Sequence, residues 1–298
     1  MGTPTQKKRW RIRPGRIAGW TALILLVIVT LLPFVWALRT ALTPNADIFN
    51  GDYSLIPRNA SLINFKRVLG LVSPEEDLAA GGAGARMYFW LYLRNSLIFT
   101  GLLVLGQLVT STMAAYAFAR LRFKGRDHLF MLFLGTLVLP QEVLVIPLYI
   151  GMQRMGLVNS YFALIVPFAF GAFGAFLIRQ FLMSLPLEFE EAARIDGCSD
   201  WKILTKILLP LLKAPITVVG VFAFIDYWSA FLWPLIVVND SSLATIPLGL
   251  QMFSGERGTD WGPLMAAVTM TTIPSILLVV FLQKQLEKGV TLGAFGGR

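Results

Sequence analysis

Six long apolar blocks constrain the fold of this chain more than any other feature. Each block approaches the roughly 20 apolar residues that a helix needs to cross the hydrocarbon core of a membrane. The predicted spans are 17–38, 96–118, 129–150, 161–178, 216–238 and 263–282. Only 14% of the 298 residues are charged, whereas soluble domains carry about a quarter. The sequence therefore predicts an all-α membrane protein with six transmembrane helices.

The basic residues predict which ends of these helices face the cytoplasm. When the connections are assigned to alternate sides, 18 of the 26 Lys and Arg residues fall on the side that holds both termini, and 8 on the other. Because Lys and Arg are enriched in cytoplasmic loops, we expect both termini, the 120–126 turn and the 179–213 connection to be cytoplasmic. Topology then explains the net charge of +9, so we expect membrane lipid and no nucleic acid as a partner.

We expect a single membrane domain with two tails and one long loop. The long loop contains the run "EEDLAAGGAGAR", which is typical of a flexible insertion, so no separate soluble domain is predicted. The predicted parts are a basic cytoplasmic tail (1–16), the first span (17–38), an extracytoplasmic loop (39–95), a core with the other five spans (96–283) and a cytoplasmic tail (284–298).

The residue inventory argues against several kinds of chemistry. With one cysteine, Cys198, and one histidine, His128, the chain has no internal disulfide and few ligands for a transition metal. A membrane-embedded enzyme would need clustered His, Cys or carboxylates, and a channel would need rings of charge or a carbonyl filter. We predict no enzyme, no metal site and no cofactor on this chain. It also lacks a G-x-x-x-x-G-K-[ST] phosphate loop, so ATP hydrolysis that powers transport would occur on another polypeptide.

The connection between the fourth and fifth spans is predicted to form two short helices. Pro186 suits a first helical position, and Gly197 is a typical stop. Ser199 or Asp200 can cap a second helix, which Pro210 and Pro215 would close. Helices of this length are marginal in water unless they contact something else. From composition alone, a docking surface and a solvated linker both remain possible.

The order of residues in this connection resembles the EAA motif of inner-membrane permease subunits of ATP-binding-cassette (ABC) importers. Other pieces resemble the carbohydrate-importer branch of that family, the maltose-transporter type: "RNS", "AAYAFARLRFKGRD", "LPQEVLVIPLY" and "FLWPLIVV". The motif residues, in order and at the family's spacing, are Glu191, Ala192, Ala193, Gly197, Ile207, Leu209 and Pro210.

The resemblance implies a type I ABC importer permease fold in the inner membrane of a bacterium or archaeon. It implies that the 186–210 loop carries a coupling helix, which lies in a groove of a cytoplasmic ATPase. Glu191 would pair with a basic ATPase residue, while Gly197 would permit the sharp turn and Asp196 would stabilise it. The implied partners are a homologous second permease, two ATPase subunits that bind ATP and Mg, and an extracytoplasmic solute-binding protein.

Polar residues within the spans are candidates for the translocation path. Asp226 lies near the middle of the fifth predicted span, where an ionisable group is costly and usually functional. A structural hydrogen bond is the alternative. The family usually has Trp-Asn and an acidic residue near Ser229, so Asp226 would either take over that acidic role from an earlier position or indicate a different solute. Gln141 and Glu142 follow Pro140, which would kink the third span and is tolerated beside a cavity or a protein partner.

The solute and the docking loop are expectations from the same resemblance. The solute would be a sugar or oligosaccharide, with glycerol phosphate, a glycerophosphodiester or a polyamine as alternatives. The polar run "SGERGTDWG" would dock the binding protein, although a plain surface loop is the other interpretation. The candidate docking residues are Ser254, Gly255, Glu256 and Arg257.

Overall fold

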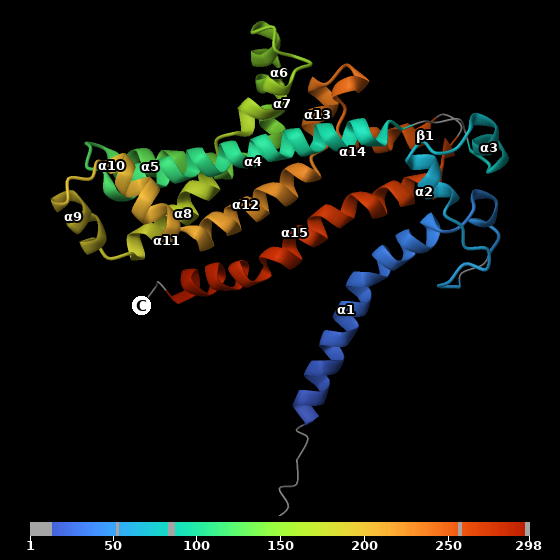
Figure 1. Ribbon diagram of the computed structural model, residues 1–298, viewed down its shortest axis with the longest axis horizontal. Coiled ribbons are helices and arrows are strands. Elements are labelled where there is room, and N and C mark those ends of the chain that lie inside the picture. The colour runs from blue at the N-terminus through green and yellow to red at the C-terminus, as the bar shows by residue number, and fades with distance from the viewer. Residues whose placement is uncertain (1–13, 52–53, 83–86, 256–257, 296–298) are drawn as a thin grey trace, which may run out of the picture.

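Three unbroken helices set the dimensions of the molecule. The computed structural model describes residues 14–51, 54–82, 87–255 and 258–295 (Figure 1). Within these residues, three helices are long and apolar enough to cross a membrane: α1 (Pro14–Ala41), α4 (Phe89–Arg120) and α15 (Trp261–Phe295). They correspond to the first, second and sixth predicted spans. Both α1 and α4 continue into the expected 39–95 loop, which is therefore shorter than the sequence suggested.

The third and fourth predicted spans are bent pairs of helices. In the third, α5 (Arg126–Gly135) and the 3-10 helix η2 (Thr136–Val138) meet α6 (Gln141–Arg154) at 101°. The break falls at Pro140 because the residue before a proline is disfavoured in helical conformation. In the fourth, α7 (Tyr161–Ile165) and η3 (Val166–Phe168) meet α8 (Ala172–Ser184) at 42°.

The fifth predicted span is shorter than expected. The helix α12 (Lys213–Trp228) ends well before residue 238, and a separate short helix, α13 (Leu232–Val237), follows. The ring of Pro234 would clash with the carbonyl of Ala230 in a continuous helix, which accounts for the break between them. Asp226 therefore lies at the end of a helix, where the sequence had placed it near the middle of one. A third bent pair joins the helical segment Asp200–Leu211 to α12 at 80°, and counting each of the three pairs as one span gives up to six spans among the described residues, by length and composition.

The connection before α12 contains more helix than predicted. It comprises α9 (Glu188–Ile195), α10 (Asp200–Lys202), the π-helical segment η4 (Ile203–Leu208) and α11 (Leu209–Leu211). The first helix begins two residues after Pro186. The second helix runs one residue beyond Pro210 and ends at Leu211, between the two prolines that were predicted to close it. The wide π turn just before Pro210 relaxes the backbone at the carbonyls that the proline ring would otherwise meet. We call residues 186–211 the EAA segment.

Short elements cover the opposite end of the bundle. Ser254 pairs with Thr259 across an antiparallel two-stranded hairpin. The elements are η1 (Asn45–Asp47), α2 (Ile63–Val68), α3 (Pro74–Ala79), η5 (Ser241–Leu243), α14 (Ile246–Leu250), η6 (Gln251–Phe253), β1 (Ser254–Gly255) and β2 (Gly258–Thr259).

The long helix α4 organises the packing. It lies against α8 and α12, α12 lies against α15, and α15 against α1. Three buried clusters follow one another along the bundle, and α4 contributes to each, through Tyr92, Phe99 and Tyr116 respectively. A helix packed along its whole length moves as one body, so α4 can connect the two ends mechanically.

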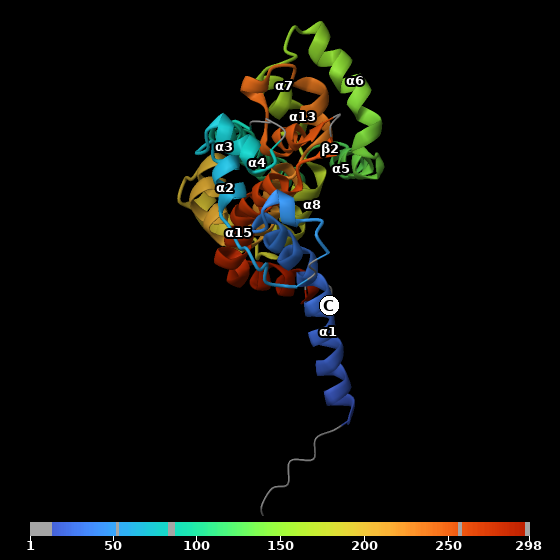
Figure 2. The ribbon, with the colours of Figure 1, turned by 90° about the vertical axis from the view of Figure 1, so that its right-hand side faces the viewer.

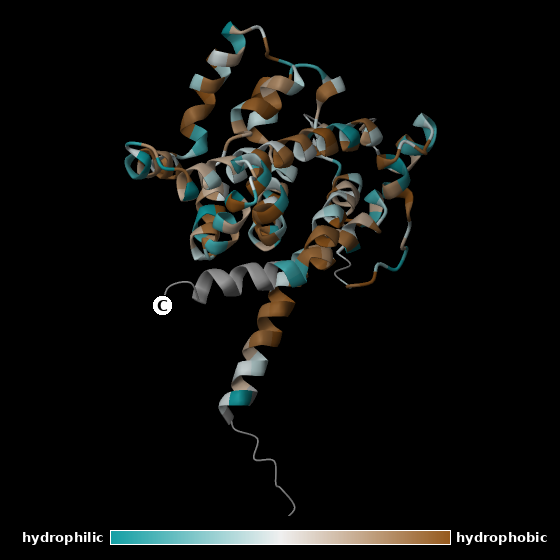
Figure 3. Cartoon of the chain, turned by 60° about the vertical axis from the view of Figure 1, so that its left-hand side comes forward, coloured by the Kyte–Doolittle hydropathy of each residue, from teal (hydrophilic) through white to brown (hydrophobic). Residues whose placement is uncertain are grey.

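The helix α1 leaves the bundle. Figures 1 and 2 both show it diverging from the other helices toward its amino-terminal end. Its most apolar window, within Ala18–Ala41, has no buried residue, and Figure 3 shows this helix coloured as hydrophobic over most of its length. Such a surface is stable only against lipid or another protein.

Candidate functional site

A buried ion pair ties the EAA segment to the end of α4. Arg120 Nε lies 2.5 Å from Glu190 Oε1, and the two side chains are only 6% and 1% exposed. The same guanidinium donates to the carbonyl oxygens of Leu182 and Leu185, at 2.7 and 3.1 Å. A buried charge is tolerated when it is paired and hydrogen-bonded. The start of α9 is therefore fixed to α4 and to the end of α8.

A second tie joins both helices of the EAA segment to α4. The Tyr116 hydroxyl lies 3.1 Å from Asp200 Oδ1, and Arg194 donates to the same oxygen at 3.2 Å. The hydrogen bond to Asp200 raises the pKa of Arg194. Because Arg194 is on α9 and Asp200 on α10, this carboxylate holds the two helices together where they contact α4.

The turn between the two helices requires glycine. Gly197 has φ 76°, a left-handed conformation that glycine adopts without steric cost. Its N–H donates to Arg194 O at 3.0 Å, and the N–H of Cys198 donates to Ala193 O at 2.9 Å, which is the Schellman arrangement. The predicted stop at Gly197 is confirmed. Backbone bonds alone close the turn in the described residues, without the predicted help from the Asp196 side chain.

The exposed face of the EAA segment combines acidic and apolar groups. Glu191, Ala192 and Asp196 are exposed, whereas Ala193 is buried against its own bundle and so does not face a partner. Large apolar side chains are also exposed here, and sequence reasoning missed them: Leu187, Phe189, Ile195 and Trp201, with Ile195 at 87%. A group of exposed apolar side chains marks a contact with another protein or with the membrane.

The residues in the second half of the EAA motif differ in how exposed they are. Ile207 is half-buried, packed beside the cluster that includes Leu208, and Leu209 and Pro210 are exposed. The motif residues therefore divide between a face turned toward the bundle and a face turned away from it.

All four candidate path residues line one cavity, which we call the polar cavity. It has a volume of about 230 Å³. Gln141 and Glu142 reach it from the start of α6, and Asp226 and Ser229 from the end of α12. The helix breaks at Pro140 and after Trp228 thus create the site. An adjoining cavity of about 710 Å³ shares Gln141, Asp226 and Ser229.

The helix α4 also reaches the polar cavity. Gln107 Nε2 donates to the Tyr227 hydroxyl and to the Phe168 carbonyl oxygen, each at 3.0 Å, and both Tyr227 and Phe168 line the cavity. Sequence reasoning missed Gln107, although a polar side chain inside an apolar span is the same signal that identified Asp226. No group of three metal-ligating side chains occurs within the residues that the structure describes.

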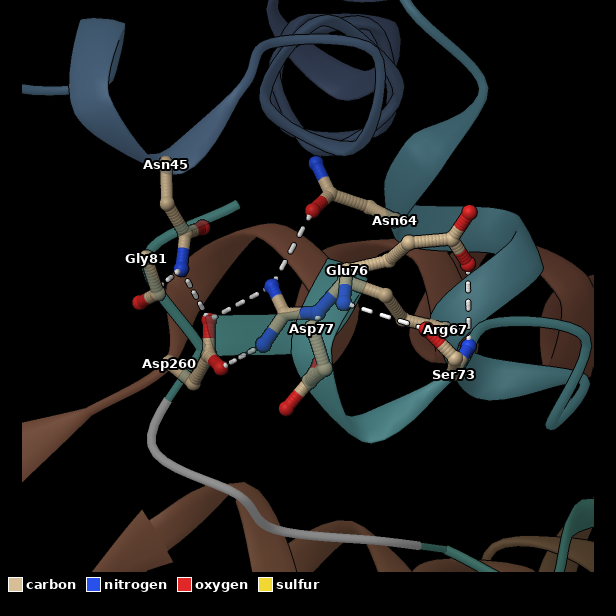
Figure 4. Close-up of polar contacts among 8 residues, drawn as sticks. All are labelled: Asn45, Asn64, Arg67, Ser73, Glu76, Asp77, Gly81 and Asp260. Carbon is tan, nitrogen blue, oxygen red and sulfur yellow. Dashed lines mark hydrogen bonds and ion pairs between the residues drawn. The ribbon is translucent and has the colours of Figure 1, made fainter. Parts of the chain in front are cut away.

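A buried charge cluster, the Arg67 cluster, stabilises the end of the bundle near α2 and α3 (Figure 4). Arg67 Nε lies 2.5 Å from Asp77 Oδ1, and its Nη2 pairs with Asp260. Asn45 donates to Asp260 and Asn64 accepts from Arg67. Burial by itself lowers the pKa of Arg67, but the hydrogen bonds and negative charges of Asp260 and Asp77 outweigh it and raise that pKa.

The Arg67 cluster also fixes the base of the hairpin that carries the predicted docking residues. The N–H of Asp260 donates to the carbonyl of the buried Phe253 at 2.8 Å, which closes the hairpin. Ser254 and Gly255 form its first strand, and both are exposed. The other two candidates, Glu256 and Arg257, lie outside the described residues.

Comparison with protein families identifies the chain. Residues 107–292, which hold the EAA segment and the four polar cavity residues, match the family described as "Binding-protein-dependent transport system inner membrane component". The chain belongs to this family. The resemblance inferred from the EAA motif is thereby confirmed.

Curated members of this permease family resemble the chain over most of its length. The probable ABC transporter permease protein YurM of Bacillus subtilis is 33% identical over 98% of this chain and 91% of its own. The arabinooligosaccharides transport permease AraQ of Halalkalibacterium halodurans is 35% identical over 70% of this chain and 75% of its own. The sn-glycerol-3-phosphate transport permease UgpE of Salmonella typhi is 33% identical, over 92% and 95% respectively.

A solved structure confirms the fold. A chain of a bacterial ABC transporter involved in the import of the acidic polysaccharide alginate superposes with a TM-score of 0.77. It is 22% identical, and the match covers 95% of this chain and all of that chain. The predicted helical fold of a type I ABC importer permease is therefore confirmed.

Proposed function

We propose that the EAA segment of this permease subunit of a binding-protein-dependent ABC importer docks on a separate ATPase subunit, and that α4 transmits the movement of this segment to the polar cavity. In this proposal ATP binding draws two ATPases together, and the EAA segments of a permease pair move with them. The pair then alternates between inward-facing and outward-facing states, as expected of two conformations that a ligand favours unequally.

The observation that carries this proposal is the attachment of α4 to both regions. Arg120 and Tyr116 hold the EAA segment at one end of α4. Thirteen residues earlier on the same unbroken helix, Gln107 is bonded to Tyr227 and Phe168 in the wall of the polar cavity. A displacement of α9 is thus transferred to the cavity without passing through a flexible loop.

The exposed face of the EAA segment supports a particular kind of ATPase groove. Its acidic groups, Glu191 and Asp196, complement basic side chains, and its apolar side chains complement an apolar floor. Apolar anchors supply most of the binding energy at protein interfaces, whereas charges guide orientation. We therefore propose a groove with a basic rim that receives Glu191.

We propose a sugar or oligosaccharide as the solute. The named relatives support this choice through arabinooligosaccharides, and they leave glycerol phosphate as the second candidate. The further partners proposed are a homologous second permease, a second ATPase and a solute-binding protein that docks near Ser254 and Gly255. The distribution of Lys and Arg supports both termini facing the cytoplasm.

Reversing the charge of Glu191 tests the docking proposal. In the assembled transporter, Glu191→Lys should reduce both the amount of ATPase that copurifies with the permease and the ATPase activity stimulated by loaded binding protein. The matched control is Glu75→Lys, which makes the same charge change on the exposed surface of α3. Wild-type copurification and stimulation in Glu191→Lys would contradict the docking role.

A further inference from the structure

The polar cavity carries acidic groups and no basic ones. Glu142 and Asp226 both line it, and no Lys, Arg or His occurs among the described residues that line this cavity or the adjoining one. Neither acid has an ion-pair partner within the described part of the chain. A carboxyl group supplies no positive charge in either protonation state, so these walls offer no counter-charge to an anion.

The partial charges at the helix ends beside the cavity do not make it positive. The start of α6 opens at the cavity and presents the partial positive charge of a helix amino terminus. Glu142 lies in the first turn of that helix and offsets this charge. The carboxyl-terminal end of α12, beside Asp226, contributes partial negative charge.

The remaining lining is suited to a molecule that has many hydroxyl groups. Gln141 and Ser229 can donate and accept hydrogen bonds, and carboxylates accept them from hydroxyls. Aromatic rings provide flat apolar surface of the kind that packs against the C–H face of a sugar ring. The aromatic lining residues are Phe99, Phe168, Tyr227, Phe231 and Trp233.

We propose that the polar cavity of this subunit contacts the solute directly and admits a neutral or cationic polyhydroxylated molecule, while it disfavours anions such as phosphorylated or uronic-acid solutes. This inference rests on the proposed function, because it takes the cavity to be part of the translocation path. It selects between the two solute classes: a neutral sugar or an amino sugar fits the lining, and glycerol phosphate does not.

Thiol probes of opposite charge measure this selectivity without knowledge of the solute. Cys198 is first replaced by Ser, and Ser229→Cys then places one thiol in the cavity of the complete transporter. The rate of modification by a trimethylammonium methanethiosulfonate is compared with the rate for a sulfonate methanethiosulfonate. A neutral thiol in solution, 2-mercaptoethanol, gives the intrinsic ratio of the two reagents.

The inference predicts that the cationic reagent is favoured at residue 229 by at least about tenfold over the ratio for the free thiol, because a cleft of one charge sign concentrates the opposite ion. The preference should fall in Asp226→Asn and fall further when Glu142→Gln is added. An equal or faster reaction with the anionic reagent would overturn it. So would transport of sn-glycerol 3-phosphate by reconstituted wild type at a rate above that of neutral oligosaccharides.

These outcomes are separable from a failure of the docking proposal. The reagent ratio reports charge near residue 229 and does not depend on ATP hydrolysis. If Glu191→Lys left coupling intact, the ratio would still decide whether the cavity is cation-selective.

Discussion

Glu190 and Glu191 are neighbours in the sequence and have different environments on α9. Glu191 is exposed, whereas Glu190 is buried and bonded to Arg120. The first is free to meet a partner, and the second fixes the helix to its own chain. In the proposed mechanism Glu191 serves docking and Glu190 serves transmission, so substitutions at the two positions test the two roles separately.

Removing either member of the Arg120–Glu190 pair should destabilise the protein. A single Glu190→Leu leaves the guanidinium buried without its carboxylate, which costs about 3–5 kcal/mol, and replacing both residues by apolar ones restores much of the loss. Thermal unfolding of the purified permease should therefore show Arg120→Met/Glu190→Leu to be more stable than Glu190→Leu. A double variant no more stable than the single one would show that the buried charge is not the cause.

The sequence did not reveal this pair, although it located the motif around it. A basic residue at the end of a span indicates which side of the membrane that end faces. Arg120 therefore counts among the cytoplasmic basic residues, and nothing in the sequence indicates that it is buried in an ion pair. Its partner, Glu190, lies 70 positions away in the sequence. The two side chains meet only because α9 packs against the end of α4, which the sequence does not show. By contrast, Gly197 was predicted correctly because its left-handed turn is a local requirement.

The elements α2, α3 and α15 are held together by the Arg67 cluster. Arg67→Met would leave Asp77 and Asp260 buried without their cation, and such a loss costs about 3–5 kcal/mol. We expect a lower unfolding temperature and faster proteolysis of the hairpin after Phe253. The matched control is Lys66→Met, which removes an exposed positive charge from the adjacent position of α2. Equal stability of the two variants would rule out a structural role for the cluster.

Unbroken elements were predicted better than broken ones. The predicted spans that correspond to α1, α4 and α15 are uniformly apolar, so hydropathy located most of their ends to within a few residues. The exceptions are the start of α4 and the end of α15, where the helices extend further than predicted. Where a span is broken, the helices before and after the break are both apolar. Hydropathy therefore does not show that the second helix runs in a different direction from the first. Pro140 was recognised as a kink, but the interruption after Trp228 was not, although Pro234 was its local signal.

The bundle brings together residues from spans that are far apart in the sequence. Gln141 and Glu142 were selected from one span, and Asp226 and Ser229 from another, without any sequence indication that they share a cavity. Their convergence depends on the bend between α5 and α6 and on the end of α12. The aromatic part of the lining could not be predicted for the same reason.

Solute transported per ATP hydrolysed measures whether α4 couples the EAA segment to the cavity through Glu190. The measurement compares wild type, Glu190→Gln and Glu188→Gln in proteoliposomes with the ATPase and binding protein. Glu188 is the matched control because it is an exposed glutamate on the same helix. We predict that Glu190→Gln retains its ATPase subunits and lowers the transport ratio at least about tenfold, with Glu188→Gln near wild type. A wild-type ratio in Glu190→Gln would show that coupling does not pass through Glu190.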